Sequence, residues 1–171
     1  MKISYYVPNE NNALEVNVDA TTLEGFHFDG MNLHRVDLRN AFLNGASFVA
    51  TDLRNAYLMD ADAIGCDFSN ASLVMADLQR AKLRKSTFHC LLYYANFDHA
   101  DLSGADFSGA AVKDTHFEDC DLRGAIMLAE NLDSAHFAGA KFDKHTVWPE
   151  GFSPLEHGAI LIGDGKAHDA C

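Results

Sequence analysis

The chain has 171 residues, 48% of them hydrophobic and 22% charged, which is the composition of one folded domain with a substantial core. Thirteen Lys and Arg stand against 25 Asp and Glu, and the net charge of −12 argues against direct binding of nucleic acid or of an anionic membrane surface. The apolar runs fall far short of the ~18 residues of a membrane span, and the N-terminus lacks the apolar stretch of a signal peptide. These features predict a soluble, cytoplasmic protein.

Residues 1–15 begin the chain with a short strand pattern. Ile3, Tyr5 and Val7 occupy every second position before Pro8. Because the open end of a repeat array tends to pair with other chains, we expect this segment to be an N-terminal cap.

Residues 16–147 repeat every five residues. Each unit has a large apolar centre, preceded two positions earlier by a small residue. There are 25 centres, and all are Leu or Phe except Ala63, Val112 and Met127. The small position holds Ala, Ser, Thr or Cys in 21 of the 25 units. Two registered columns of this length predict a repeat architecture.

A period of five fits neither a helix nor a strand, so the chain must turn once per unit. Four turns close a square, which predicts coils of about 20 residues stacked at about 4.8 Å. The units then form an all-β solenoid of about six coils, capped at both ends. The centres predicted to fill its core include Leu53, Phe68, Leu73, Phe88, Phe107, Phe117, Leu122 and Phe137.

Several units match a known motif as written. Residues 95–99, 100–104 and 105–109 read ANFDH, ADLSG and ADFSG. The chain resembles the pentapeptide-repeat proteins from about Val16 to Val147. The resemblance implies a right-handed quadrilateral β-helix, and it is the sole source of the handedness.

Three departures from a uniform repeat carry separate expectations. One corner column, with about 20 residues between successive members, is glycine in five of its six coils and predicts turns with positive φ there. The column holds Gly25, Gly45, Gly65, Lys85, Gly104 and Gly124. One unit, at Ser86–His89, has four residues and should tighten the coil locally. Glu130 falls on a small inward position, and we expect the wall to bulge and turn this carboxylate outward.

The C-terminal residues end the repeat. Pro149 and Pro154 interrupt it, so residues 148–162 are predicted to form a C-terminal cap and residues 163–171 a loose tail.

The cysteines of the repeat and the cysteine of the tail are expected to differ in burial. Cys66, Cys90 and Cys120 occupy small inward positions and should be buried and reduced, whereas Cys171 is a free thiol on the tail.

The sequence offers little catalytic chemistry. It has no phosphate-binding glycine motif, zinc-protease motif or nucleophile elbow. His116 and His136 share one exposed column with Glu118 nearby, and we interpret them as a solvated ladder because a tight metal site needs three or four ligands. We expect the aspartates that precede the centres to bond to the backbone of the turns; they are Asp52, Asp62, Asp67, Asp77, Asp101, Asp106 and Asp121. A filled rod also has no deep cleft, so we predict no catalytic residue, cofactor or metal, and no enzyme activity.

An apolar group interrupts positions that are otherwise mostly polar. Val74 and Met75 should stack on Tyr93 and Tyr94 of the next coil, with Leu91 beside them. An exposed apolar patch marks a protein contact, unless the N-terminal segment covers it or these residues are tolerated scatter on the surface. A second group, Ile126, Leu128 and Trp148, is interpreted as packing of the C-terminal cap.

Charge is distributed unevenly along the chain. Residues 1–85 carry a net charge of −3 and residues 86–171 carry −9, with a basic band of Arg80, Lys82, Arg84 and Lys85 before the boundary. We predict a non-catalytic scaffold that binds a protein partner, with homodimerisation left open. The resemblance supplies an alternative, because some pentapeptide-repeat proteins imitate duplex DNA, bind the type II topoisomerase gyrase and inhibit or protect it.

Overall fold

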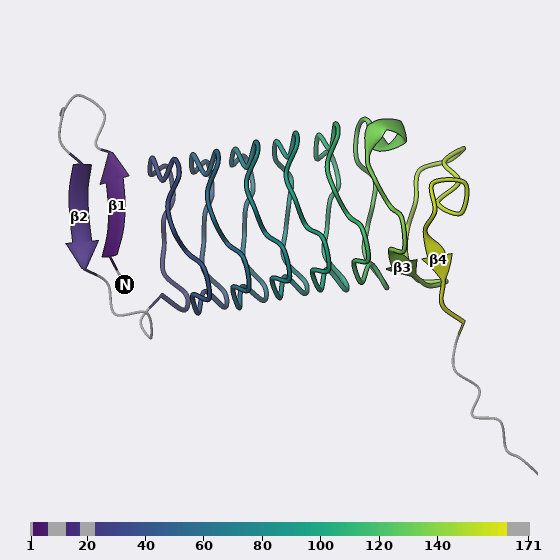
Figure 1. Ribbon diagram of the computed structural model, residues 1–171, viewed down its shortest axis with the longest axis horizontal. Helices are drawn as coiled ribbons and strands as arrows, with labels where there is room; N and C mark the ends of the chain where they lie inside the picture. The colour runs from purple at the N-terminus through teal and green to yellow at the C-terminus, as the bar shows by residue number, and fades with distance from the viewer. Residues whose placement is uncertain (1, 7–12, 18–22, 164–171) are drawn as a thin grey trace, which may run out of the picture.

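The computed structural model describes residues 2–6, 13–17 and 23–163. Strands β1 (Lys2–Tyr6) and β2 (Ala13–Asn17) form an antiparallel hairpin, drawn beyond the first coil in Figure 1. From Leu23 onward the chain winds through successive turns along one axis (Figure 1). We call each stretch of about 20 residues a coil. No helix in the described parts of the chain is long and apolar enough to cross a lipid bilayer.

Neighbouring coils are joined by isolated parallel bridges at the residue that precedes each centre. Four consecutive bridges, each spanning 20 residues, are Asp52↔Ser72, Tyr57↔Asp77, Asp62↔Lys82 and Asp67↔Thr87. The Leu58 amide, for example, donates to the Asp77 carbonyl at 2.7 Å. Since the chain turns in every unit, the bridges do not extend into strands in this region. The coil length of 20 residues that the sequence predicts is therefore present in the register of the backbone.

The turns between units depend on a left-handed backbone conformation. In a typical turn, the Ala61 amide donates to the Leu58 carbonyl at 3.1 Å, and Asp60 between them has φ 59°. The predicted glycine column has positive φ at every level, from 57° at Lys85 to 69° at Gly45. A Cβ atom added to Gly45 would meet nothing within 4 Å, so glycine serves the backbone angle there rather than close packing.

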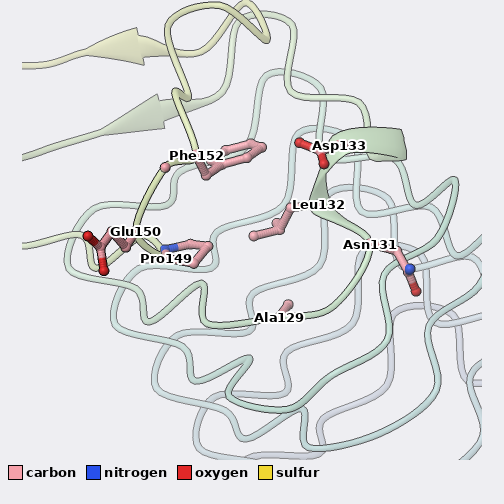
Figure 2. A pocket seen from close by; sticks show the side chains of 8 residues that line it. Ala129, Asn131, Leu132, Asp133, Pro149, Glu150 and Phe152 are labelled. Carbon is pink, nitrogen blue, oxygen red and sulfur yellow. The ribbon is translucent and has the colours of Figure 1, made fainter.

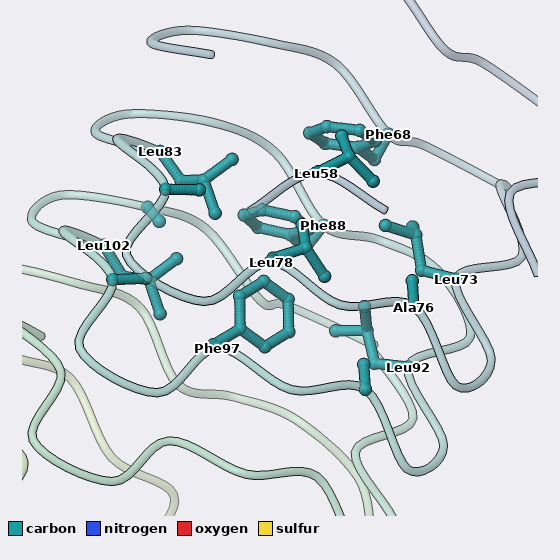
Figure 3. Close-up of a cluster of buried hydrophobic side chains, with 14 of the residues drawn as sticks. Leu58, Phe68, Leu73, Ala76, Leu78, Leu83, Phe88, Leu92, Phe97 and Leu102 are labelled. Carbon is teal, nitrogen blue, oxygen red and sulfur yellow. The ribbon is translucent and has the colours of Figure 1, made fainter. Parts of the chain in front are cut away.

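The interior is a stack of aromatic and aliphatic rungs. All eight core residues named from the sequence are buried, with exposed fractions of 1% or less. Phe68 and Phe88 stack at 5.0 Å between ring centroids, and Figure 3 shows them among Leu58, Leu78 and the adjoining leucines. A second stack, with Phe97 and Phe117 at 5.3 Å, meets the first edge-on. The described core is therefore filled by closely packed side chains.

Polar side chains at the small inward position find partners on the preceding coil. The Thr51 hydroxyl donates to the Phe28 carbonyl at 2.8 Å, and the Ser86 hydroxyl donates to the Ala63 carbonyl at 2.8 Å. The thiols of Cys66 and Cys120 make the same kind of contact, to the carbonyls of Leu43 and Phe97. These groups are buried without loss of hydrogen bonding, which explains why Ala, Ser, Thr and Cys share one column.

The four-residue unit closes by a tighter turn than the others. The Cys90 amide donates to the Phe88 carbonyl at 2.7 Å, two residues back instead of three. The coil it belongs to has 19-residue bridges, such as Ser72↔Leu91, and the Leu91 amide reaches the Ala71 carbonyl at 3.3 Å. The predicted local tightening is thus a γ-type turn that the hydrogen-bond ladder absorbs.

The last coils depart from the regular register before the chain ends. Glu130 is exposed and bridges Ala111, so the wall turns this carboxylate outward as expected. The short 3₁₀ helix η2 (Leu132–Ser134) follows, and β3 (Lys141–Phe142) then pairs in parallel with β4 (Ile160–Leu161). The division of the chain at residues 15, 147 and 162 stays a prediction, and residues 164–171, with Cys171, lie outside the described residues.

Candidate functional site

The apolar patch named from the sequence lies on two adjacent coils. We use "apolar patch" for Val74, Met75, Leu91, Tyr93 and Tyr94. The Met75 amide donates to the Tyr93 carbonyl at 2.9 Å, and Leu91 bridges Ser72. These backbone contacts place Val74 beside Tyr93 and Met75 beside Tyr94.

Three of the five side chains are exposed to solvent. Met75 is 58% exposed, Tyr94 52% and Leu91 45%, whereas Val74 and Tyr93 are half-buried. Residues 7–12 and 18–22 of the N-terminal segment lie outside the described residues, so its predicted covering of the patch stays open.

Met75 and Tyr94 also occupy an unfavourable backbone conformation. Both have φ 59°, in the left-handed region. The same corner of neighbouring coils holds Asn55 and Asp114, residue types that tolerate this conformation far better than a large apolar residue. Local stability would favour a polar residue at both positions, so the exposed apolar side chains are not explained by the fold.

The second apolar group divides into an inner and an outer part. Trp148 packs inside the cap, with ring centroids 5.5 Å from Phe137 and 5.3 Å from Phe152. Leu128 remains 44% exposed, and Ile126 bridges Val147, which is also 44% exposed. The interpretation as cap packing therefore holds for Trp148, while Ile126 and Leu128 lie on the outer wall.

A shallow pocket lies where the register changes near the C-terminal end. It has a volume of about 300 Å³ and is lined by Ala129, Asn131, Leu132, Asp133, Pro149, Glu150, Gly151 and Phe152 (Figure 2). Its charged lining residues are both acidic, and neither is buried. The sequence did not predict this pocket, which lies where the bridge Ala111↔Glu130 spans 19 residues and η2 follows.

Three of the four residues of the basic band pair with acids on neighbouring coils. Arg80 forms a two-point ion pair with Asp60 at 2.8 Å, and the Lys82 ammonium lies 3.0 Å from Asp62. Arg84 lies 3.6 Å from Asp101. Arg80, Lys82 and Arg84 therefore present paired charges rather than free cationic groups.

Most of the aspartates that precede the centres have the role predicted for them. Asp67 accepts the Ser69 amide at 2.8 Å, and Asp52 and Asp121 each add a two-point pair with the arginine two residues on. Those arginines lower the pKa of both carboxyls. Asp62 is the exception, because Asn44 accepts the Ile64 amide that Asp62 would otherwise bind.

The histidine ladder contains a group that the sequence interpretation missed. The His116 and His136 rings stack at 4.6 Å, and His116 Nδ1 lies 3.3 Å from Glu118 Oε1. Asp98, on the preceding coil, comes within 4.8 Å of both. Its position 20 residues before Glu118 is the signal that could have identified it.

The chain is similar to known proteins over its repeat region. The family model described as pentapeptide repeats matches residues 15–48, 51–89 and 89–124 with eight copies. HetL, a pentapeptide repeat protein involved in heterocyst differentiation regulation from the cyanobacterium Nostoc sp. strain PCC 7120, is 22% identical over 78% of this chain and 71% of its own, with a TM-score of 0.36. No curated protein matches the sequence.

Two further solved structures are similar to the chain. QnrB1, a plasmid-mediated fluoroquinolone resistance protein, is 18% identical over 85% of this chain and 88% of its own, with a TM-score of 0.37. A pentapeptide repeat protein from Nostoc PCC 7120 is 34% identical over 68% of this chain and 84% of its own, with a TM-score of 0.25.

Proposed function

Because this chain belongs to the pentapeptide-repeat family, we propose that it is a non-catalytic scaffold that binds a protein partner through the apolar patch. The proposal takes the coils to be a right-handed quadrilateral β-helix of about six coils, capped at both ends. Such a rod holds its faces rigid, so a patch on it is ordered before the partner arrives and little entropy is lost on binding. We place the protein in the cytoplasm, in keeping with the free, buried thiols of Cys66, Cys90 and Cys120.

One observation carries the assignment of the patch. Met75 and Tyr94 are large, exposed and apolar at a corner where their backbone conformation is unfavourable. Aromatic residues and methionine are enriched at protein interfaces, where they supply contact area. A contact with a protein partner would offset the local loss of stability.

The test is a photocrosslinking amino acid placed at position 94. We expect it to join the protein to a partner of defined mass in cells. The matched control is the same amino acid at position 42, where Phe42 is 50% exposed and bridges Asp62, away from the columns of the apolar patch. Equal labelling from positions 42 and 94, or none from position 94, would refute the assignment of this face.

The alternative function is that of an acidic DNA mimic that binds gyrase. The net charge of −12 favours it, as does the likeness to QnrB1, a fluoroquinolone resistance protein. A gyrase supercoiling assay separates the two functions. Inhibition at low micromolar protein, or protection of gyrase from a quinolone, would favour the mimic. In that case the acidic surface of the protein, rather than the apolar patch, would bind gyrase.

A further inference from the structure

Three side chains with metal-binding atoms converge on one face of the rod. Asp98 follows the Phe97 centre, and His116 and Glu118 flank the Phe117 centre on the next coil. One ligand atom from each residue lies within 4.8 Å of the other two. The His116 Nδ1 to Glu118 Oε1 distance of 3.3 Å equals the separation of two ligands that each lie about 2.0 Å from a shared tetrahedral ion.

The negative charge of this group is balanced only in part, by His116, which pairs with Glu118 when it is protonated. Glu118 Oε2 is fully enclosed and has no hydrogen-bond partner. Among the described residues, no lysine or arginine forms an ion pair with Asp98 or Glu118. Two carboxylates held together in this way are a strong attractor for a cation.

The backbone holds the three groups in place. The Phe97 amide donates to the His116 carbonyl and the His99 amide to the Glu118 carbonyl, both at 2.9 Å. The Glu118 amide donates to Asp98 Oδ1 at 3.1 Å. The His136 ring, 17° from parallel with that of His116, limits the rotation of the imidazole from the other side. The arrangement is therefore largely preformed, as a binding site requires.

We propose that Asp98, His116 and Glu118 bind one divalent transition-metal ion, with Zn²⁺ as the ion that fits best. One imidazole and two carboxylates form a mixed nitrogen and oxygen set, which suits zinc, whereas Mg²⁺ and Ca²⁺ prefer oxygen ligands alone. The ion would link two coils and neutralise the carboxylates. Three protein ligands leave a fourth position for water or for a group of a bound partner.

The test is calorimetric titration of the full chain with Zn²⁺, in a Cys171→Ser background that removes the competing terminal thiol. We expect one site that is lost in His116→Ala and weakened in Asp98→Asn. Loss of groups that only orient ligands weakens metal sites about 10- to 100-fold, so loss of a ligand should raise the Kd at least tenfold. Zinc at about a hundred times its Kd should raise the Tm by about 5–10 °C in the parent and not in His116→Ala.

His89→Ala is the matched control. His89 Nε2 lies 3.2 Å from Asp106 Oδ2, a histidine and carboxylate pair without a third ligand. We expect this variant to bind zinc as the parent does. Equal loss of binding in His89→Ala and His116→Ala, or an unchanged Kd in His116→Ala, would overturn the proposal. Binding of Mg²⁺ as tight as that of Zn²⁺ would overturn the choice of metal class.

Asp98→Asn retains the shape of the side chain and removes a repelling charge, so the apo fold should survive and a loss of zinc affinity would be specific.

Discussion

Phe88 and Phe107 stack at 4.8 Å with their rings 9° from parallel, although the chain between them is one residue shorter than in a regular coil. The stack is as close here as between Phe68 and Phe88, where the spacing is regular. The γ-type turn at Phe88–Cys90 absorbs the missing residue, and the core column continues through it. Core packing therefore dominates over turn geometry in setting the register of the rod.

This continuity makes Phe107 a test of the core. We expect Phe107→Ala to lower the free energy of unfolding by about 3–5 kcal/mol, because a fully buried aromatic side chain is lost from a close-packed column. Urea denaturation measures the change. Ser108→Ala is the control, with an expected change of about 0.5 kcal/mol or less, since its hydroxyl bonds only to Asp106 on the outer wall. A loss below about 1 kcal/mol in Phe107→Ala would contradict the assigned register.

The strained corner of the apolar patch leads to a stabilising substitution. We expect Met75→Asn and Tyr94→Asn each to raise the free energy of unfolding by about 0.5–1 kcal/mol, because asparagine tolerates φ near 59°. The reverse change at the same corner, Asn55→Met, should be destabilising. Urea melts of the three variants compare them directly. If Met75→Asn were destabilising by 1 kcal/mol or more, Met75 would be packed within the protein and not available to a partner.

Self-association through the apolar patch is separately testable. If the protein forms dimers, Tyr93→Ala combined with Tyr94→Ala should weaken association by at least about 2 kcal/mol, because buried aromatic residues dominate such contacts. Light scattering over a range of concentrations measures it, with Tyr57→Ala as the control. An unchanged dimer would move the interface to the outer wall around Ile126 and Leu128. If the parent protein is monomeric, the patch does not mediate self-association, and the proposed partner is a different protein.

The thiols should differ sharply in reactivity. Burial raises the pKa of Cys66 to about 12 and also raises the pKa values of Cys90 and Cys120. We therefore expect these three to react with a thiol reagent only on unfolding, whereas Cys171 reacts at once. Counting modified thiols by mass spectrometry before and after adding urea checks this. A disulfide among the first three would contradict both the register and the cytoplasmic assignment.

Acid should destabilise the fold through its arginine-paired aspartates. Arg54 and Arg123 hold the pKa values of Asp52 and Asp121 below the ordinary value, so these pairs contribute stability above the unfolded-state pKa of about 3.9. That contribution is lost as the pH falls further. Unfolding free energies measured from pH 4 to pH 2 should decline, and Asp121→Asn should reduce the slope. Glu150→Gln, at an exposed position, should leave the slope unchanged.

The sequence by itself determined the architecture, because a five-residue period is visible wherever the same two inward positions recur. The identity of the core residues, the burial of Cys66, Cys90 and Cys120 and the positive φ of the glycine column all follow from that register. Even the outward turn of Glu130 was predictable, since a buried unpaired carboxylate is too costly to keep.

Only the tertiary structure decided how side chains on neighbouring coils meet. The register places Asp98 one coil from Glu118, but rotamers decide whether their oxygens converge, and the enclosed Glu118 Oε2 is a consequence of that choice. The same holds for the pairing that neutralises Arg80 and Lys82, and for the direction in which Trp148 points. A backbone repeat sets where a residue stands, whereas contacts across coils depend on side-chain angles that the repeat leaves free.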